Sequence, residues 1–72
     1  MWFVNYCVNN GNNIAVTSTG TFECKTIRIL LSQLVSALND DTLYYEKDNA
    51  VKTTYYVYSR NNKELFIVAT KF

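Results

Sequence analysis

The 72-residue chain contains no histidine, and only two of its residues are glycine. Without histidine, neither a Ser-His-Asp triad nor a Cys-His pair can form, which excludes two common devices of nucleophilic catalysis. Gly11 and Gly20 stand alone, so no glycine-rich loop is available to cradle a phosphate. A chain this short also has little material with which to enclose a substrate pocket. We therefore expect a protein that is not an enzyme.

The sequence lacks the residues that a metal or cofactor site would need. Cys7 and Cys24 are too few for a disulfide framework and lack the paired spacing of a zinc site. We expect two free thiols in a reducing compartment; a Cys7–Cys24 disulfide and a reactive or metal-bound thiol are the alternatives. Asp40, Asp41 and Glu46 lack the surrounding ligand pattern of a calcium loop, so we expect them in solvated segments. No cofactor and no metal are expected.

Neither sign of charge dominates, and no long apolar run is present. Seven Lys and Arg against six Asp and Glu give a formal net charge of +1. This balance is too neutral for a typical phosphate-backbone binder and not acidic enough for a nucleic-acid mimic. The start, MWFVN, has neither the positive segment nor the apolar segment of a signal peptide, and no stretch predicts a transmembrane helix. We expect a cytoplasmic protein with no membrane contact.

The residues that are abundant favour one small folded domain spanning 1–72. Apolar residues make up 49% of the chain and aromatic residues 15%, which is ample for a core. A domain of this length buries only about 60% of its unfolded surface, so its stability is marginal. Six tyrosines, many asparagines and no proline are the usage of an AT-rich genome, either bacterial or phage.

One segment, TIRILLSQLVSALN from Thr26 to Asn39, has the periodicity of an amphipathic helix. Its apolar side chains fall on one face at 100° per residue. That face consists of Ile27, Leu30, Leu31, Leu34, Val35 and Leu38. Thr26 is the expected N-cap and Asn39 the expected end of the helix. Ile29 lies on the polar side, as a partly covered surface residue or as a partner contact.

Short alternating segments predict five strands around this helix. The expected strands are 2–8, 14–24, 42–47, 50–59 and 64–72. The order ββαβββ, with a meander at its end, predicts an α+β two-layer sandwich in which one helix covers one face of an antiparallel sheet.

The register of the first hairpin depends on its loop. A two-residue loop at Asn10-Gly11 would place polar residues opposite apolar ones. A three-residue loop, 10–12, instead places Val8 opposite Ile14 and Tyr6 opposite Val16, with a left-handed residue at Asn12. We expect the three-residue loop.

The segment TTYYVYS, 53–59, must distribute its tyrosines between two faces of the sheet. With Asn61-Asn62 as a two-residue loop, Tyr58 lies opposite Leu65 and Tyr56 opposite Ile67. Tyr55 and Val57 then share the helix-facing side with Phe66, Val68 and Phe72. A three-residue loop at 48–50 adds Leu43 and Tyr45 to that side, and Tyr44, Glu46 and Lys52 to the other. The candidate partner-binding residues are Tyr44, Tyr56, Tyr58, Leu65, Ile67, Arg60 and Lys63.

Three interpretations of this tyrosine-rich face stay open. Cross-strand Tyr–Ile and Tyr–Leu pairs stabilise an open face without any partner. Tyrosine is also enriched in interfaces, which favours a protein-binding or self-associating surface. The same tyrosines, with Arg60, Lys63, Lys52 and Lys71, would suit a nucleic-acid stacking platform. A homodimer would form if the last strand, 64–72, were an exposed edge that pairs across a two-fold axis.

The whole-chain pattern resembles the small phage-encoded anti-CRISPR proteins and similar inhibitors of bacterial defence. The resemblance covers all 72 residues as element order, length and composition, without a sequence motif. It implies a protein that works by binding in the host cytoplasm. Such a protein would occupy a surface of a CRISPR effector, a nuclease or a guide-RNA complex, and so block access to target DNA or its cleavage. The near-neutral charge departs from the acidic DNA mimics, so steric occupation through the tyrosine face is the expected mechanism.

Overall fold

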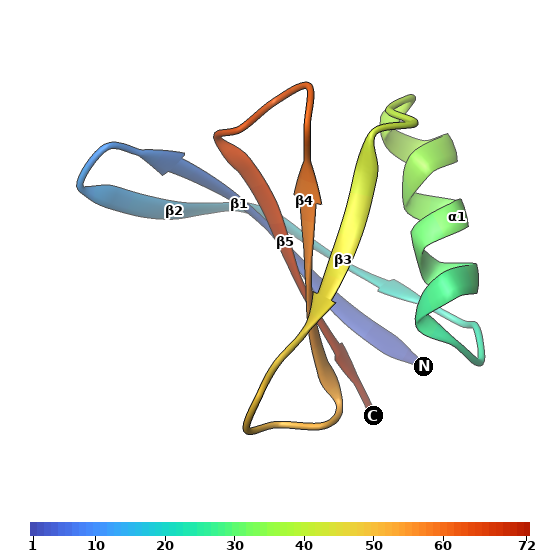
Figure 1. Ribbon diagram of the computed structural model, residues 1–72. Coiled ribbons are helices and arrows are strands. Elements are labelled where there is room, and N and C mark those ends of the chain that lie inside the picture. The colour runs from blue at the N-terminus through green and yellow to red at the C-terminus, as the bar shows by residue number, and fades with distance from the viewer.

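The computed structural model describes residues 1–72, apart from the side chain of Asn10. Its elements are β1 (Trp2–Asn10), β2 (Asn13–Phe22), α1 (Ile27–Leu38), β3 (Leu43–Lys47), β4 (Thr54–Ser59) and β5 (Leu65–Lys71). Five antiparallel strands form one sheet, and the single helix packs on one side of it (Figure 1). The predicted α+β class and ββαβββ order are confirmed.

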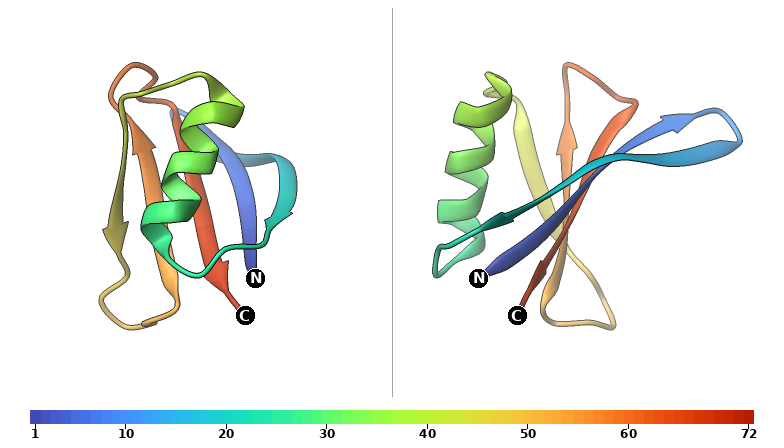
Figure 2. Two further views of the ribbon diagram at one scale, coloured as in Figure 1. Left: turned by 90° about the vertical axis from the view of Figure 1, so that its right-hand side faces the viewer. Right: turned by 180° about the vertical axis from the view of Figure 1, so that it is seen from behind.

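The strand order is β2-β1-β5-β4-β3, so β2 and β3 are the two edges of the sheet. Helix α1 connects these two edges and crosses one face of the sheet (Figure 2, left). Strand β5 lies at the centre, paired with β1 on one side and β4 on the other. The predicted exposed edge at 64–72 is therefore wrong, because both sides of β5 are already paired.

Local capping fixes the two ends of α1 where the sequence predicts them. The Thr26 hydroxyl accepts a hydrogen bond from the Ile29 amide at 3.3 Å. Asn39 adopts the left-handed conformation, with φ 52°, and its amide bonds to the carbonyl of Val35. An asparagine tolerates this conformation better than most residues, because its short polar side chain bonds locally. The helix thus presents Ile27, Leu30 and Leu34 to the sheet as buried residues.

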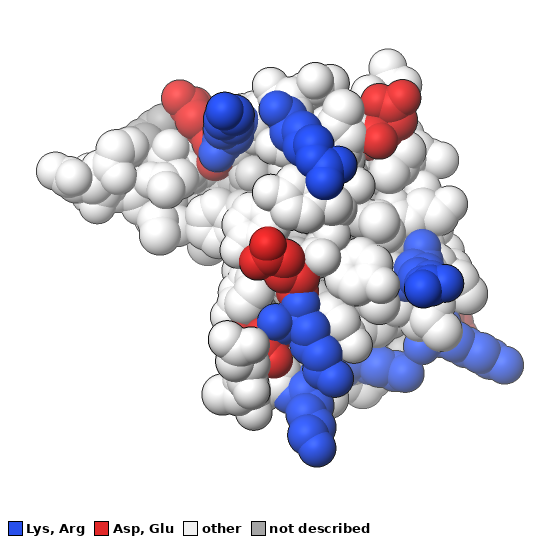
Figure 3. Space-filling model, viewed as in Figure 1, with Lys and Arg blue, Asp and Glu red and all other residues white. Residues whose placement is uncertain are grey.

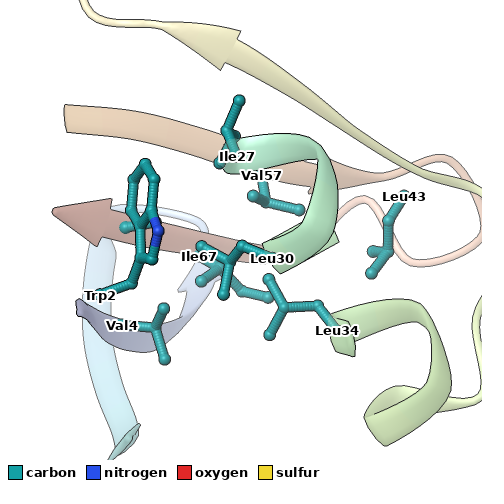
Figure 4. Packing of buried hydrophobic residues seen from close by; sticks show 9 residues of the cluster. Trp2, Val4, Ile27, Leu30, Leu34, Leu43, Val57 and Ile67 are labelled. Atoms are coloured by element: carbon teal, nitrogen blue, oxygen red, sulfur yellow. The ribbon is translucent and has the colours of Figure 1, made fainter. Parts of the chain in front are cut away.

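The core lies between α1 and the sheet face that it covers (Figure 4). Leu30, Leu34 and Val4 are fully buried there, and Trp2 is nearly so. The Trp2 indole Nε1 donates to the carbonyl of Cys24 at 3.1 Å, so its one polar group is satisfied. Each fully buried side chain of this kind stabilises the fold by about 1.5–3 kcal/mol.

The β4–β5 register differs from the predicted one by a single residue. Val57 lies opposite Ile67, and Tyr58 opposite Phe66. Because side chains alternate, a shift of one residue moves every β5 side chain to the other face. The predicted register is wrong since the connection is longer than two residues: the Leu65 amide bonds to the Asn62 carbonyl at 3.1 Å. Ile67 is consequently buried beneath the helix, and Phe66 is not.

The β3–β4 register also differs, but without exchanging the faces. Leu43 lies opposite Ser59, because six residues, 48–53, separate the two strands. This is four residues from the predicted pairing, an even number, so Leu43 and Tyr45 still face the helix as predicted. Lys52 lies in the exposed loop rather than on the sheet, which corrects its predicted position.

The first hairpin turns through Gly11 and Asn12, not through a three-residue loop. Gly11 carries the positive φ, 66°, in the first loop position, as in a type II′ turn. Both registers considered from the sequence are wrong, since Cys7 lies opposite Val16. A bulge then inserts Thr17, whose hydroxyl donates to the Tyr6 carbonyl at 3.1 Å.

Candidate binding face

None of the described residues forms a second layer on the face of the sheet away from α1, and an uncharged row with three aromatic members, which we call the aromatic row, crosses this face. Each member of the row lies directly opposite the next on the neighbouring strand. From β3 to β2 the row consists of Tyr44, Tyr58, Phe66, Cys7 and Val16. Directly opposite residues share a face, and no member of this row is charged. We call this uncovered side the open face.

A pocket of about 390 Å³ lies at one end of the aromatic row, where β4 turns into β5. It is lined by Tyr44, Tyr58, Ser59, Arg60, Lys63 and Leu65. The two tyrosine rings are neighbours on adjacent strands, with centroids 5.6 Å apart and planes tilted by 35°. The Arg60 guanidinium carbon lies 4.4 Å from the centre of the Tyr44 ring. This distance is typical of a cation–π contact, which holds the arginine beside the pocket.

A hydrogen-bond network fixes the loop that carries the two cations. Buried Ser59 donates to Asp40 at 2.6 Å and accepts from the Asn62 amide at 3.0 Å. Thr42 also donates to Asp40, through its hydroxyl at 2.6 Å and its amide at 2.9 Å. The hydrogen bond from Ser59, followed by those from Thr42, lowers the pKa of the Asp40 carboxyl. The carboxylate therefore joins the end of α1 to the loop of the pocket.

Tyr56 lies on the open face in the next row, but its hydroxyl is already engaged. It donates to the Asp48 carboxylate at 2.5 Å, and Asp48 also accepts from the amides of Ala50 and Val51 at 2.8 Å each. The Tyr56 hydrogen bond is the main reason why the pKa of Asp48 is lowered and that of Tyr56 is raised. Tyr56 thus anchors the β3–β4 loop, and it offers a partner only its ring.

The pocket combines apolar walls with hydrogen-bond donors. Burial, together with nearby Glu46 and Tyr44, raises the pKa of Tyr58. A tyrosine hydroxyl is protonated at neutral pH, and the raised pKa extends that state to higher pH, so the hydroxyl of Tyr58 can donate a hydrogen bond. Arg60 and Lys63 add two exposed cations beside the aromatic rings. Such a pocket suits a group that pairs an apolar or aromatic surface with negative charge.

The structure brings five of the seven predicted site residues into this one pocket: Tyr44, Tyr58, Leu65, Arg60 and Lys63. Leu65 lies opposite Val8, which places it on the same face as buried Ile67 and not on the open face. It still lines the pocket, because it is the first residue of β5 and lies at the end of the sheet. Ile67 has no exposed surface, so it is not available to a partner. Phe66 and Val68 take the open-face positions that the sequence assigned to Leu65 and Ile67. The alternation of side chains along β5 was visible in the sequence, but the length of the β4–β5 loop decides which set of side chains faces the helix.

Other site chemistry is limited in the described part of the chain. No group of three or more His, Cys, Asp or Glu residues there could hold a metal ion. Both cysteines are free, Cys7 buried and Cys24 half-buried. Of the described helices, none is long and apolar enough to cross a membrane. No family model, curated protein or solved structure matches the chain.

Proposed function

We propose that the chain is a non-enzymatic binding module that docks a partner protein on its open face. The observation that carries this proposal is the aromatic row, which runs across an uncovered sheet and ends in a pocket with two cations beside it. Tyrosine and arginine are enriched at the energetic centres of interfaces, because they combine a large contact area with hydrogen bonding. The pocket contains both residue types in direct contact.

The charges around the pocket favour an acidic partner segment. Arg60 and Lys63 lie beside the rings, so an aspartate or glutamate next to an apolar side chain would satisfy both parts of the pocket. The resemblance to inhibitors of bacterial defence extends the proposal. In that extension, the partner is a defence effector, and the chain acts by occupying its surface rather than by chemistry.

A charge reversal in the pocket tests the proposal. Arg60→Glu removes the cation beside Tyr44 without touching the core, because Arg60 is exposed. We expect it to abolish inhibition in a plasmid-interference assay in bacteria with an active CRISPR system, and to abolish retention of the effector on the immobilised chain. Arg28→Glu is the matched control, since Arg28 is exposed on the helix, and it should behave as wild type.

Separate outcomes distinguish the two parts of the proposal. If wild type does not inhibit interference, the defence extension fails. If the Arg60→Glu and Tyr58→Ala variants both retain a partner as well as the wild-type chain does, the pocket assignment fails.

A second function, nucleic-acid binding, is favoured by the cation–π contact between Arg60 and Tyr44. A base stacked on the tyrosines would bring its phosphate towards Arg60 and Lys63. Binding of single-stranded RNA or DNA that weakens steeply with salt would support this function. The absence of any mobility shift at low salt would exclude it.

A further inference from the structure

The two edges of the sheet differ in how well they are protected against pairing with another chain. Edge β3 has five residues, includes Glu46 and Lys47, and is followed by Asp48. Charged side chains on a short edge strand are a common protection against such pairing. Edge β2 has ten residues and none of them is charged. No charged residue occurs anywhere before Glu23, and the chain has no proline.

The unprotected edge projects from the body of the molecule. The hairpin end of strands β1 and β2 forms an arm that extends away from α1 (Figures 1 and 2), and its tip is free of acidic and basic side chains (Figure 3). Residues 13–19 are all exposed, including two branched apolar side chains. Ile14 is 65% exposed and Val16 59% exposed. Apolar, β-branched residues on an uncharged edge form a template for another strand.

We propose that a second copy of this chain occupies the edge, pairing antiparallel through β2 about a two-fold axis at Ala15. In this register Ile14 lies opposite Val16 of the partner subunit, and Val16 lies opposite Ile14 of the partner subunit. Both contacts join exposed apolar residues. A strand that carries charges would place them against Ile14 and Val16, whereas the two-fold axis supplies a second uncharged strand. β3 cannot be that strand without bringing Glu46 and Lys47 into the pairing.

The bulge at Thr17 limits the length of the pairing. A bulge bends and twists its strand, so the regular contact is confined to residues 13–17. Five residues span about 17 Å. Such an edge covers far less than the roughly 800 Å² per partner of a standard stable interface. The dimer is therefore weak, and its population rises with concentration.

The geometry has a consequence for the open face. Directly opposite residues share a face, so the axis runs perpendicular to the sheet and both open faces lie on the same side. The aromatic row of each copy then ends at Val16, which lies opposite Ile14 of the partner subunit. The dimer carries two tyrosine pockets at the far ends of one continuous sheet, although the pairing itself does not depend on what those pockets bind.

Sedimentation velocity at increasing concentration tests the proposal on the full chain. We expect the wild-type sedimentation coefficient to rise between about 20 μM and about 2 mM, as mass action requires. Val16→Glu should raise the concentration for half-dimerisation at least about tenfold, because it places a charge on the edge. Ser32→Glu is the matched control: it adds the same charge at an exposed helix position and should dimerise as wild type.

Mixing two variants tests the register. Ile14→Lys and Val16→Glu should each stay monomeric alone, yet an equimolar mixture should dimerise at low salt. In that mixture the new lysine lies opposite the new glutamate across the axis. Circular dichroism should show both variants folded, since both positions are exposed.

Three results would overturn the proposal. The first is a wild-type chain that stays monomeric at the highest concentration. This result counts against the proposal even if the monomer binds an unrelated extended peptide at the same edge. The second is dimerisation that Val16→Glu leaves unchanged. The third is a mixture that stays monomeric, which would reject the axis at Ala15.

Discussion

Truncation of Ile67 is the most direct test of the fold on which the binding face depends. Ile67 has no exposed surface and lies between Val57 of β4 and Tyr6 of β1, beneath the helix. Replacing a buried isoleucine with alanine removes its burial energy and leaves a cavity, at a cost of about 2–5 kcal/mol. A chain of this size has a total stability of about 4–11 kcal/mol. Ile67→Ala should therefore lose a large share of the folding free energy.

Urea unfolding followed by circular dichroism measures this loss. The matched variant is Val68→Ala, the next residue along β5, which lies half-buried on the open face and should cost less than about 1.5 kcal/mol. If Ile67→Ala is too unstable to fold, Ile67→Val should still cost about 0.5–1.5 kcal/mol, or roughly 0.5–1.5 M in the urea midpoint. A loss at Val68 that equals or exceeds the loss at Ile67 would refute the observed register. That result would agree instead with the sequence-based register, which buries Val68.

Two further perturbations test the network around the core and the loops. Trp2→Phe should cost about 1–3 kcal/mol in thermal or urea unfolding, because it leaves the Cys24 carbonyl without its indole donor; a change below about 0.5 kcal/mol would contradict that role. Asp40 and Asp48 both have a lowered pKa in the folded chain, so they contribute stability above the ordinary aspartate pKa, about 3.9, and lose it as pH falls through the lowered pKa. The urea midpoint should decrease as the pH is lowered from 5 to 2, and this decrease should be smaller in Asp40→Asn. An equal dependence of the midpoint on pH in wild type and in Asp40→Asn would exclude the Asp40 carboxylate as its source.

The helix and the element order were predictable because their determinants are local. The spacing of Leu30 and Leu34 indicates one buried face, and the side chains of Thr26 and Asn39 cap the ends of the same segment. Neither signal requires knowledge of another part of the chain. The order ββαβββ follows from such local patterns taken one after another.

The strand registers were not predictable, because each depends on loop contacts between residues far apart in sequence. The pocket loop is bonded through Ser59 to Asp40, 19 residues away, and this network favours a connection longer than two residues. The resulting shift of one residue exchanged the faces of β5, whereas the shift of four in β3–β4 preserved them. Tyr44 and Tyr58 were therefore placed correctly, and Ile67 was not.

The distribution of charge along the chain connects the two proposals. All charged side chains follow Phe22, so the aromatic row has cations beside it at its β3–β4 end and none at its β2 end. A binding surface gains specificity from charge at its rim, while an edge that pairs with itself gains from having none. The pocket and the β2 edge lie on opposite sides of the central strand β5. A substitution at one should consequently leave the other intact, so the two surfaces can be assigned independently by the variants above.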